Sequence, residues 1–275
     1  MNKIVEKRML SENVAKLVIE APQIAQKQHP GQFVIVRIDD KGERIPLTIA
    51  DADKKGGTIT LIIQKVGTSS HKIINLNPGD ILLDVSGPLG RPTHIEKVGT
   101  VLASGGGVGI APLYPIARAF KNAGNRLINV LGARSKDLLI LEEEMADCAD
   151  EQIVMTDDGS YGKKGVITVG IEAVLKRETV NLVVTIGPAV MMKFVALLTK
   201  KYQIPTVASL NTIMVDGTGM CGACRVSVAG KTKFVCVDGP EFDAHEIDYD
   251  EMMKRLNTYK KEEQSSYESY LKTLA

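Results

Sequence analysis

The sequence lacks the features that mark membrane, nucleic-acid-binding and disulfide-stabilised proteins. It has no tryptophan, only four cysteines in 275 residues, and 34 lysines and arginines against 33 aspartates and glutamates. A chain of this length buries enough surface to fold without disulfides. Its net charge of +1 is far from the basic excess of nucleic-acid-binding proteins. No run of 18 apolar residues is present, so we expect a globular protein with neither a nucleic-acid nor a membrane partner.

The N-terminus carries no apolar stretch of signal-peptide length, so a cytoplasmic location is predicted. In that reducing compartment, clustered cysteines more often bind metal or carry out redox chemistry than form disulfides. Three cysteines, Cys221, Cys224 and Cys236, lie within 16 residues of one another. Cys148 stands apart, and we predict that it is a small, half-buried residue of a helix.

The chain changes character along its length, which predicts about two domains. Residues 1–95 contain short β-prone segments between Gly, Pro and Asp turns, as is typical of a sandwich or small β-barrel. In residues 96–205, strand-like and helical segments alternate, which predicts an α/β domain with a parallel sheet. Residues 206–245 form a small lobe rich in glycine and cysteine, and residues 246–275 form a charged helical tail. Within these regions we expect strands at residues 13–20, 33–38, 45–50, 58–65 and 81–85, and helices at 110–122, 138–148 and 190–202.

A glycine-rich turn, Gly105-Gly106-Gly107-Val108-Gly109, precedes the helix at 110–122. Glycines let the backbone approach a phosphate without side-chain clashes, and the N-terminus of a helix carries positive partial charge. These are the elements of a dinucleotide diphosphate site. Ile110 replaces the third glycine of the G-x-G-x-x-G pattern, so a flexible surface turn remains an alternative.

Later segments favour the nucleotide site. Asp157 and Asp158 follow one predicted strand, and Gly187-Pro188 follows another. Ligands of parallel sheets bind at such carboxyl ends of strands. Arg134 follows the second strand of this region. It could meet a 2′-phosphate, pair with Asp137 or stay solvated, which leaves the choice between NAD and NADP open.

In the first region, Arg44-Ile45-Pro46-Leu47-Thr48 lies on an expected strand. An arginine and a threonine on one strand edge can bind a diphosphate, although a solvated arginine is the common alternative. The segment Lys65-Val66-Gly67-Thr68-Ser69 adds small hydroxyls and a glycine that could meet a phosphate.

The cysteine cluster has the spacing C-x2-C-x11-C, which leaves four interpretations open. A thioredoxin-like pair would need a helix after the first cysteine, but glycine and β-prone residues follow. Zinc would need a fourth ligand such as His245, and unligated structural thiols are a third interpretation. The fourth is an iron–sulfur cluster, because plant-type 2Fe–2S sites use C-x4-C-x2-C and a distant cysteine. Asp216 stands at the first of these positions, either as an iron ligand or as a turn-capping residue.

The order of these motifs resembles the ferredoxin–NADP reductase superfamily. The matching segments are Arg-x-Pro-Leu-Thr at 44–48, Gly-Thr-Ser at 67–69, Gly-Pro-Leu-Gly at 87–90, Gly-Gly-Gly-Val-Gly-Ile-Ala-Pro at 105–112 and Gly-Pro-x-x-Met-Met at 187–192. Pro46-Leu47 replaces the usual aromatic residue of the flavin motif, and Ile186 replaces the cysteine that often precedes Gly-Pro. The variation is similar to the branch that contains the dihydroorotate dehydrogenase electron-transfer subunits, some members of which are called sulfide dehydrogenase subunits. Within it, the chain looks most like the small subunits of NADH-dependent reduced ferredoxin:NADP oxidoreductases, in which an aspartate replaces one cysteine ligand.

This resemblance implies a β-barrel flavin domain, an α/β nucleotide domain and a C-terminal iron–sulfur lobe, with a set of residues for each cofactor. FAD would contact Arg44, Pro46, Leu47, Thr48, Ile63, Lys65, Val66, Gly67, Thr68 and Ser69. NAD(H) would contact Gly106, Gly107, Val108, Gly109, Arg134, Asp157, Asp158, Gly187 and Pro188. The 2Fe–2S cluster would bind Asp216, Cys221, Cys224 and Cys236. No catalytic side chain is assigned, because hydride transfer to a flavin does not require a general base from this chain.

The resemblance also implies a partner, because a single-electron carrier needs another redox centre beside it. A larger flavin and iron–sulfur subunit would form a heterodimer with this chain, and ferredoxin would take part indirectly. The expected function is electron transfer between NAD(H) and that subunit, as in the electron-bifurcating enzymes. One alternative is the electron-transfer subunit of dihydroorotate dehydrogenase, which normally has four cysteine ligands. The other is a non-catalytic iron–sulfur scaffold, which the intact flavin segments disfavour.

Overall fold

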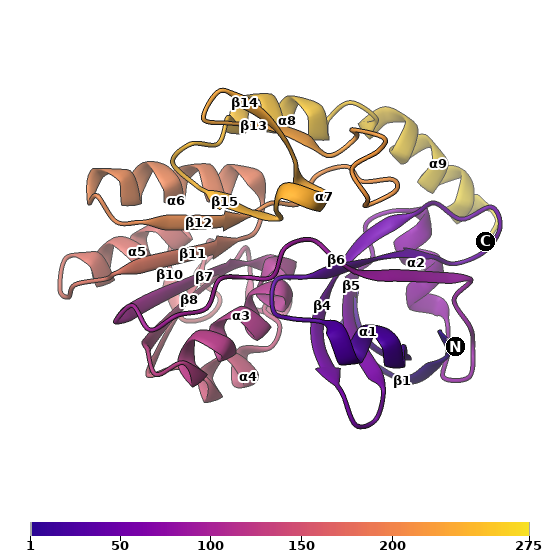
Figure 1. Cartoon of the computed structure of the whole chain (residues 1–275), viewed down its shortest axis with the longest axis horizontal. Helices are drawn as coiled ribbons and strands as arrows, with labels where there is room; N and C mark the ends of the chain where they lie inside the picture. The colour runs from indigo at the N-terminus through magenta and orange to yellow at the C-terminus, as the bar shows by residue number, and fades with distance from the viewer. Residues whose placement is uncertain (1, 275) are drawn as a thin grey trace.

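Two β-sheets organise residues 2–274, the part of the chain that this computed structural model describes (Figure 1). The first is a six-stranded antiparallel sheet with the strand order β1-β2-β5-β4-β3-β6. Its strands are β1 (Ile4–Ser11), β2 (Val14–Glu20), β3 (Phe33–Arg37), β4 (Ile45–Asp53), β5 (Thr58–Gln64) and β6 (Asp84–Leu89). The apolar pattern predicted β2 to β5 but not β1, whose charged and exposed side chains hide its strand character.

Matched apolar positions on neighbouring strands form the core of this sheet. Leu17 and Ile19 of β2 lie opposite Leu61 and Ile59 of β5, and all four side chains are fully buried. Two short helices, α1 (Pro22–Lys27) and α2 (Thr68–Asn75), pack against β5. The register of the sheet thus fixes where α2 starts.

The two edges of the first sheet approach each other just before β1 and β6. Ile4 N donates to Asp80 O at 2.8 Å, and Leu82 N donates to Asn2 O at 3.0 Å. The strand expected from residue 81 begins three residues later, at Asp84, because Ile81 and Leu82 pair with the N-terminal segment.

The second sheet has seven strands in the order β10-β9-β8-β7-β11-β12-β15. Its strands are β7 (Thr100–Gly106), β8 (Arg126–Ala133), β9 (Glu151–Thr156), β10 (Lys163–Lys164), β11 (Leu182–Ile186), β12 (Thr206–Ser209) and β15 (Glu241–Asp243). The strands from β10 to β12 are parallel, and β15 runs antiparallel to β12. The predicted parallel sheet is therefore confirmed, with one antiparallel edge strand added.

Helices cover both faces of this sheet (Figure 1). They are α3 (Ile110–Asn122), α4 (Glu142–Asp147), α5 (Ile167–Leu175) and α6 (Ala189–Lys201), with 3-10 turns at Gly107–Gly109 and Lys136–Leu138. The bounds of α3 are those predicted. The helix expected at 138–148 is shorter, because Leu141 adopts a left-handed φ of 54° and interrupts it.

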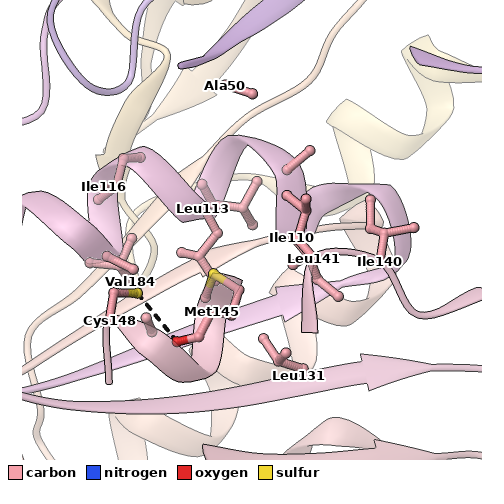
Figure 2. Close-up of a cluster of buried hydrophobic side chains, with 14 of the residues drawn as sticks. Ala50, Ile110, Leu113, Ile116, Leu131, Ile140, Leu141, Met145, Cys148 and Val184 are labelled. Carbon is pink, nitrogen blue, oxygen red and sulfur yellow. Dashed lines mark hydrogen bonds between the residues drawn. The ribbon is translucent and has the colours of Figure 1, made fainter. Parts of the chain in front are cut away.

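Figure 2 shows the cluster of buried side chains in which Cys148 lies. Leu113 and Ile116 of α3 and Met145 of α4 belong to this cluster. The Cys148 thiol donates to Met145 O at 3.2 Å, and burial raises its pKa. Cys148 therefore has the structural role predicted for it, but it is buried and caps the C-terminal end of α4, whereas a half-buried residue of the helix was expected.

The glycine- and cysteine-rich segment runs between β12 and β15, at the edge of the second sheet. It includes the hairpin of β13 (Arg225–Val228) and β14 (Lys231–Phe234), followed by α7 (Val235–Asp238). The tail forms α8 (Tyr249–Leu256) and α9 (Lys260–Lys272), and α9 lies beside α2 of the first sheet (Figure 1). The division of the chain after residues 95, 205 and 245 stays a prediction. Within residues 2–274, no helix is both long and apolar enough to cross a membrane.

Candidate functional site

The residues assigned to FAD occupy consecutive parts of the first sheet. They are Arg44 just before β4, Pro46, Leu47 and Thr48 on β4, Ile63 on β5, Lys65, Val66 and Gly67 in the connection to α2, and Thr68 and Ser69 at the start of α2. Gly67 is the N-cap of α2, and a β-carbon added there would meet nothing within 4 Å. The side chain of Val66 is 72% exposed. The first N–H groups of α2 therefore border an open turn and carry the positive end of the helix, which suits a diphosphate.

Serine side chains fix this turn. Ser70 Oγ accepts hydrogen bonds from the backbone N–H groups of Val66 and Gly67, each at 3.0 Å. Ser69 Oγ donates to Glu43 Oε2 at 2.6 Å. The Ser69 hydroxyl is thus bonded to the turn before β4, and the Ser70 hydroxyl holds the turn before α2.

Arg44 links three parts of the molecule. Its Nη1 lies 3.1 Å from Asp84 Oδ2 on β6, and its Nε donates to Val215 O at 3.0 Å. The first contact stays within the sheet, whereas the second reaches the segment that carries Asp216. Sequence reasoning assigned Arg44 to the flavin alone and missed this second contact, because nothing in the local sequence links positions 44 and 215.

The glycine turn lies where the second sheet reverses its strand order. The chain leaves β7 toward β8 on one side and later returns to β11 on the other side. Such a reversal creates a crevice at the carboxyl ends of the strands, where ligands of α/β sheets bind. The residues that border it are Gly106, Gly107, Val108 and Gly109 after β7, and Gly187 and Pro188 after β11. The structure thus brings together two segments that the sequence predicted separately.

Close packing explains the glycines of this turn. A β-carbon at Gly109 would lie 2.5 Å from Ile186 O, and one at Gly187 would lie 2.6 Å from Met191 Cε. By contrast, a β-carbon at Gly107 would meet nothing within 4 Å, although its φ of 55° still favours glycine. Gly109 and Gly187 therefore hold the two turns together, while Gly107 leaves backbone open to a ligand.

Arg134, Asp157 and Asp158 also lie at the carboxyl end of the second sheet. Asp157 N donates to Ala133 O at 3.0 Å, and Asp158 N donates to Arg134 O at 3.2 Å. The Asp158 carboxylate accepts from Ser160 N at 2.9 Å, and this bond lowers the pKa of Asp158. The Asp158 carboxylate is thus already hydrogen-bonded within its own loop, and the role of both aspartates in binding a nucleotide stays a prediction.

Asp216 organises the loop that carries the first cysteines. Its carboxylate oxygens accept from Thr218 N and from Cys221 N, each at 2.8 Å. These bonds, led by that of Thr218, lower the pKa of Asp216. Gly217, Gly219 and Gly222 all have positive φ, between 66° and 86°, so the loop turns sharply around the carboxylate. The turn-capping role is therefore present, and it places the carboxylate beside Cys221.

The other two cysteines form a buried pair. Cys224 Sγ and Cys236 Sγ lie 3.2 Å apart, and each residue is 2% exposed. Burial, together with the neighbouring Cys224 thiol, raises the pKa of Cys236 to about 12. Cys221 is exposed. Metal binding would replace the thiol protons of Cys224 and Cys236, and the metal would then be bound by both sulfur atoms.

The four candidate ligands thus form two pairs, Asp216 with Cys221 and Cys224 with Cys236. In residues 2–274, no three His, Cys, Asp or Glu side chains converge on one point that could hold a single metal ion. His245, the zinc ligand considered above, has its Nε2 3.0 Å from Thr199 Oγ1 instead. A cluster with two irons needs two protein ligands at each iron, so the paired donors fit 2Fe–2S better than tetrahedral zinc.

The cluster loop is seated on the first sheet. A β-carbon at Gly217 would lie 2.7 Å from Leu89 Cδ1 and 2.9 Å from Ile35 Cγ1. Leu89 ends β6 and Ile35 is in the middle of β3, next to β4. This close packing and a φ of 75° both favour glycine, and the part of the loop next to Asp216 therefore lies against the strands beside the flavin segments. In the sequence, the glycine at position 217 is the only indication of this contact between the loop and the first sheet.

Comparisons with known proteins match both ends of the chain. The family described as "Oxidoreductase FAD-binding domain" matches residues 2–94, which include the segments from Arg44 to Ser69. The family described as "Iron-sulfur cluster binding domain of dihydroorotate dehydrogenase B" matches residues 211–248, which include all four candidate ligands.

Relatives of full length are also similar. The "Dihydroorotate dehydrogenase B (NAD(+)), electron transfer subunit homolog" of Thermotoga maritima is 49% identical and covers 99% of this chain and 96% of its own. The electron transfer subunit of dihydroorotate dehydrogenase B from Geobacillus thermodenitrificans is 34% identical over 89% of this chain and 96% of its own. A solved structure of the NADH-dependent reduced ferredoxin-NADP oxidoreductase, reported for flavin-based electron bifurcation, superimposes with a TM-score of 0.94 at 48% identity and 98% coverage of both chains.

Proposed function

Because the chain belongs to the family of the dihydroorotate dehydrogenase B electron-transfer subunits and their homologues, we propose that it passes electrons between NAD(H) and a partner subunit. FAD and a 2Fe–2S cluster would be its resident cofactors, as the two matched families indicate. The chain itself supplies binding sites, orientation and electrostatics for them.

One observation carries this proposal: the loop with the iron ligands packs on the sheet with the flavin segments. Gly217 contacts Leu89 and Ile35, and Arg44 donates to Val215 O. A chain that only stored a cluster would not need this contact. Electron transfer between a flavin and a cluster does need it, because the two cofactors must lie close together.

The flavin segments would hold FAD by the open turn at the start of α2. The N–H groups of Thr68 and Ser69 would bind the diphosphate, with Lys65 and Arg44 adding positive charge. The β4 residues Pro46, Leu47 and Thr48 would line the ring system. When bound, the flavin supplies the exchange between hydride transfer and single-electron transfer. The hydrogen bonds between residues 2–4 and 80–82 support closure of this sheet into a barrel.

The crevice between β7 and β11 would bind the nicotinamide nucleotide. Residues 106–109 and Gly187-Pro188 would hold its diphosphate, and Asp157 would accept a hydrogen bond from a ribose hydroxyl. A carboxylate at that position repels a 2′-phosphate, which supports NAD(H) over NADP(H). Arg134, Asp158 and the helix start after Gly109 would complete the site.

The cluster segment would bind iron through Asp216 and Cys221 on one side and Cys224 and Cys236 on the other. Its exposed surface would be the exit for electrons. Met220, which precedes the exposed Cys221, is 89% exposed, and Val215, which precedes Asp216, is 49% exposed. Exposed apolar side chains of this size favour a protein partner, so we place the larger subunit of a heterodimer here. The free thiols suit a reducing compartment such as the cytoplasm.

Within the family, Asp216 supports the NADH-dependent reduced ferredoxin:NADP oxidoreductase type, in which ferredoxin would react with the partner. The alternative is a dihydroorotate dehydrogenase pairing, which the Geobacillus relative carries in its name. Isolation of the native complex distinguishes them. The first type predicts a partner that contains its own flavin and iron–sulfur centres, whereas a partner that oxidises dihydroorotate would overturn that assignment.

The proposal is tested on the purified chain by its absorption spectrum and its content of FAD, iron and sulfide. We expect a flavin band and about two irons and two sulfides per chain. A chain with iron but without flavin would support the scaffold alternative. Zinc in place of iron would overturn the cluster assignment.

A further inference from the structure

Four arginine side chains donate hydrogen bonds to backbone carbonyls next to the four proposed iron ligands. The bonds are Arg44 Nε to Val215 O at 3.0 Å, Arg225 Nη1 to Gly222 O at 3.2 Å, Arg255 Nη2 to Ala223 O at 3.1 Å and Arg91 Nε to Val237 O at 3.1 Å. Val215 precedes Asp216, Gly222 follows Cys221, Ala223 precedes Cys224 and Val237 follows Cys236. Each ligand thus has one guanidinium group bonded to an adjacent residue.

Three of these arginines come from parts of the chain outside the cysteine segment, whereas Arg225 directly follows Cys224. Arg44 precedes β4 and Arg91 follows β6, so both belong to the flavin side of the molecule. Arg225 starts β13 and Arg255 lies near the end of α8. The tertiary fold brings Arg44, Arg91 and Arg255 to the segment that already carries Arg225. We call Arg44, Arg91, Arg225 and Arg255 the arginine shell.

The hydrogen bonds set the orientation of four peptide groups. A trans peptide is planar, so its N–H points away from its C=O. When a guanidinium holds the carbonyl of Val215 or Ala223, the N–H of Asp216 or Cys224 is fixed on the opposite side. Peptide N–H groups and nearby charges are the means by which a protein tunes the reduction potential of an iron–sulfur cluster.

The positive charge of the arginine shell should change the reduction potential of the cluster in one direction only, upward. When the cluster accepts one electron, from the reduced flavin or from dithionite in a titration, one ferric ion becomes ferrous. The cluster then carries one more negative charge, which nearby cations stabilise. From the four contacts we infer that the arginine shell raises the reduction potential of the cluster and so favours electron transfer from flavin to cluster. This inference rests on the cluster assigned under the proposed function.

The four arginines differ in exposure and pairing, which predicts an order of effects. Arg91 has a side chain 70% exposed and lies 3.7 Å from Asp238, and Arg44 is paired with Asp84. Arg225 is exposed, whereas Arg255 is half-buried. Solvent and neighbouring carboxylates screen charge. Arg255 should therefore contribute most, and Arg91 least.

The test is an EPR-monitored redox titration of the four single Arg→Gln variants of the holoprotein, with iron content measured alongside. Glutamine keeps an N–H donor but removes the charge. We expect a lower reduction potential in each variant, with Arg255→Gln lowered most. The equilibrium constant for electron transfer from flavin to cluster should fall several-fold in Arg255→Gln. Arg255→Lys keeps the charge and should recover most of the wild-type potential.

Arg37→Gln is the matched control, because Arg37 Nε donates to Gly42 O at 3.2 Å within the flavin sheet, with no ligand adjacent. It should leave the cluster potential unchanged. If all four shell variants retain iron and titrate like Arg37→Gln, the inference is overturned. If Arg255→Gln loses iron, Arg255→Lys and the other three variants still decide the question. A wild-type chain without a cluster would instead contradict the proposed function.

Discussion

At the scale of single residues, Asp216 decides which ligand set the chain offers to iron. Its carboxylate accepts from Thr218 N and Cys221 N, so it shapes the loop and also borders the proposed cluster. The sequence left a capping and a ligating role open; the structure shows the capping role, and the ligating role stays a prediction. Spacing alone could not reveal this, because it says nothing about where a carboxylate points.

Asp216→Cys should retain the cluster and lower its reduction potential, because a thiolate donates more electron density to iron than a carboxylate does. Asp216→Ala should lose most of the iron. Iron analysis and an EPR redox titration check both variants, with Cys148→Ser as the control that leaves iron content unchanged. An Asp216→Ala protein with wild-type iron content and potential would show that Asp216 is not a ligand.

Gly109→Ala should destabilise the chain by about 1–3 kcal/mol, the usual range for an overpacked site. The added methyl group would lie 2.5 Å from Ile186 O and 2.8 Å from Gly187 Cα, so it would push the two turns of the nucleotide crevice apart. Urea unfolding measures the free energy, and NADH titration of flavin reduction should show a raised KM. Gly67→Ala is the control for stability, because its β-carbon would meet nothing within 4 Å. Equal stabilities of the two variants would refute the packing argument.

At the scale of elements, α9 is held by few contacts. None of its residues is buried. The Tyr267 hydroxyl oxygen lies 3.1 Å from His71 Nδ1, and Thr68 Oγ1 lies 3.4 Å from Ser266 Oγ. Both partners belong to α2, whose first turn is the proposed diphosphate site. This helix therefore packs on α2, the helix that begins at the proposed diphosphate site, without contributing to the core.

Tyr267→Phe should weaken FAD binding by up to about fivefold, since one hydrogen bond contributes about 1 kcal/mol, while the melting temperature changes little. Fluorescence titration of the flavin-free protein with FAD gives the dissociation constant. Tyr259→Phe, which removes the hydroxyl of a 54% exposed tyrosine before α9, should bind FAD like the wild type. Identical affinities of the two variants would show that α9 does not support the site.

The helices and strands also show which parts of the fold can be predicted from the sequence. The bounds of α3 and the strands of the parallel sheet follow from apolar runs and glycine turns, which are local signals. β15 was missed, because only three residues, Glu241–Asp243, join the sheet beside β12. α2 was missed for a related reason: its pattern of serines and a histidine is polar, and its stability comes from packing against β5. Three members of the arginine shell, Arg44, Arg91 and Arg255, could not be predicted, since only the tertiary fold brings them to the cysteine segment.

At the scale of the whole molecule, Glu241 lies where the parts of the chain meet. Its carboxylate accepts from Thr93 Oγ1 at 2.5 Å, and a β-carbon at Gly31 would lie 3.0 Å from Glu241 Oε1. Glu241 thus joins the edge strand β15, the connection between the two sheets and the turn before β3. Burial raises its pKa to about 7.

This raised pKa predicts that stability falls as the pH rises. The folded chain holds the Glu241 proton more tightly than the unfolded chain, so the contribution is complete below about pH 4.5 and is lost by about pH 7. The loss should amount to up to about 3 kcal/mol. Urea unfolding at pH 5 and pH 8 measures it. Glu241→Gln should remove this part of the pH dependence of stability. The control is Glu246→Gln, at an exposed position, which should retain it. A Glu241→Gln protein with the wild-type pH dependence would refute the prediction.

The central claim is that one chain carries electrons from NADH through a flavin to an iron–sulfur cluster, and that the cluster loop packs against the sheet that carries the flavin segments. The most direct measurement is the EPR spectrum of the FAD-loaded chain after anaerobic addition of NADH. The account predicts the signal of a reduced 2Fe–2S cluster, and it predicts that flavin-free protein gives this signal with dithionite but not with NADH. A cluster that NADH reduces equally well without flavin, or an FAD-loaded chain that gives no cluster signal even with dithionite, would contradict it.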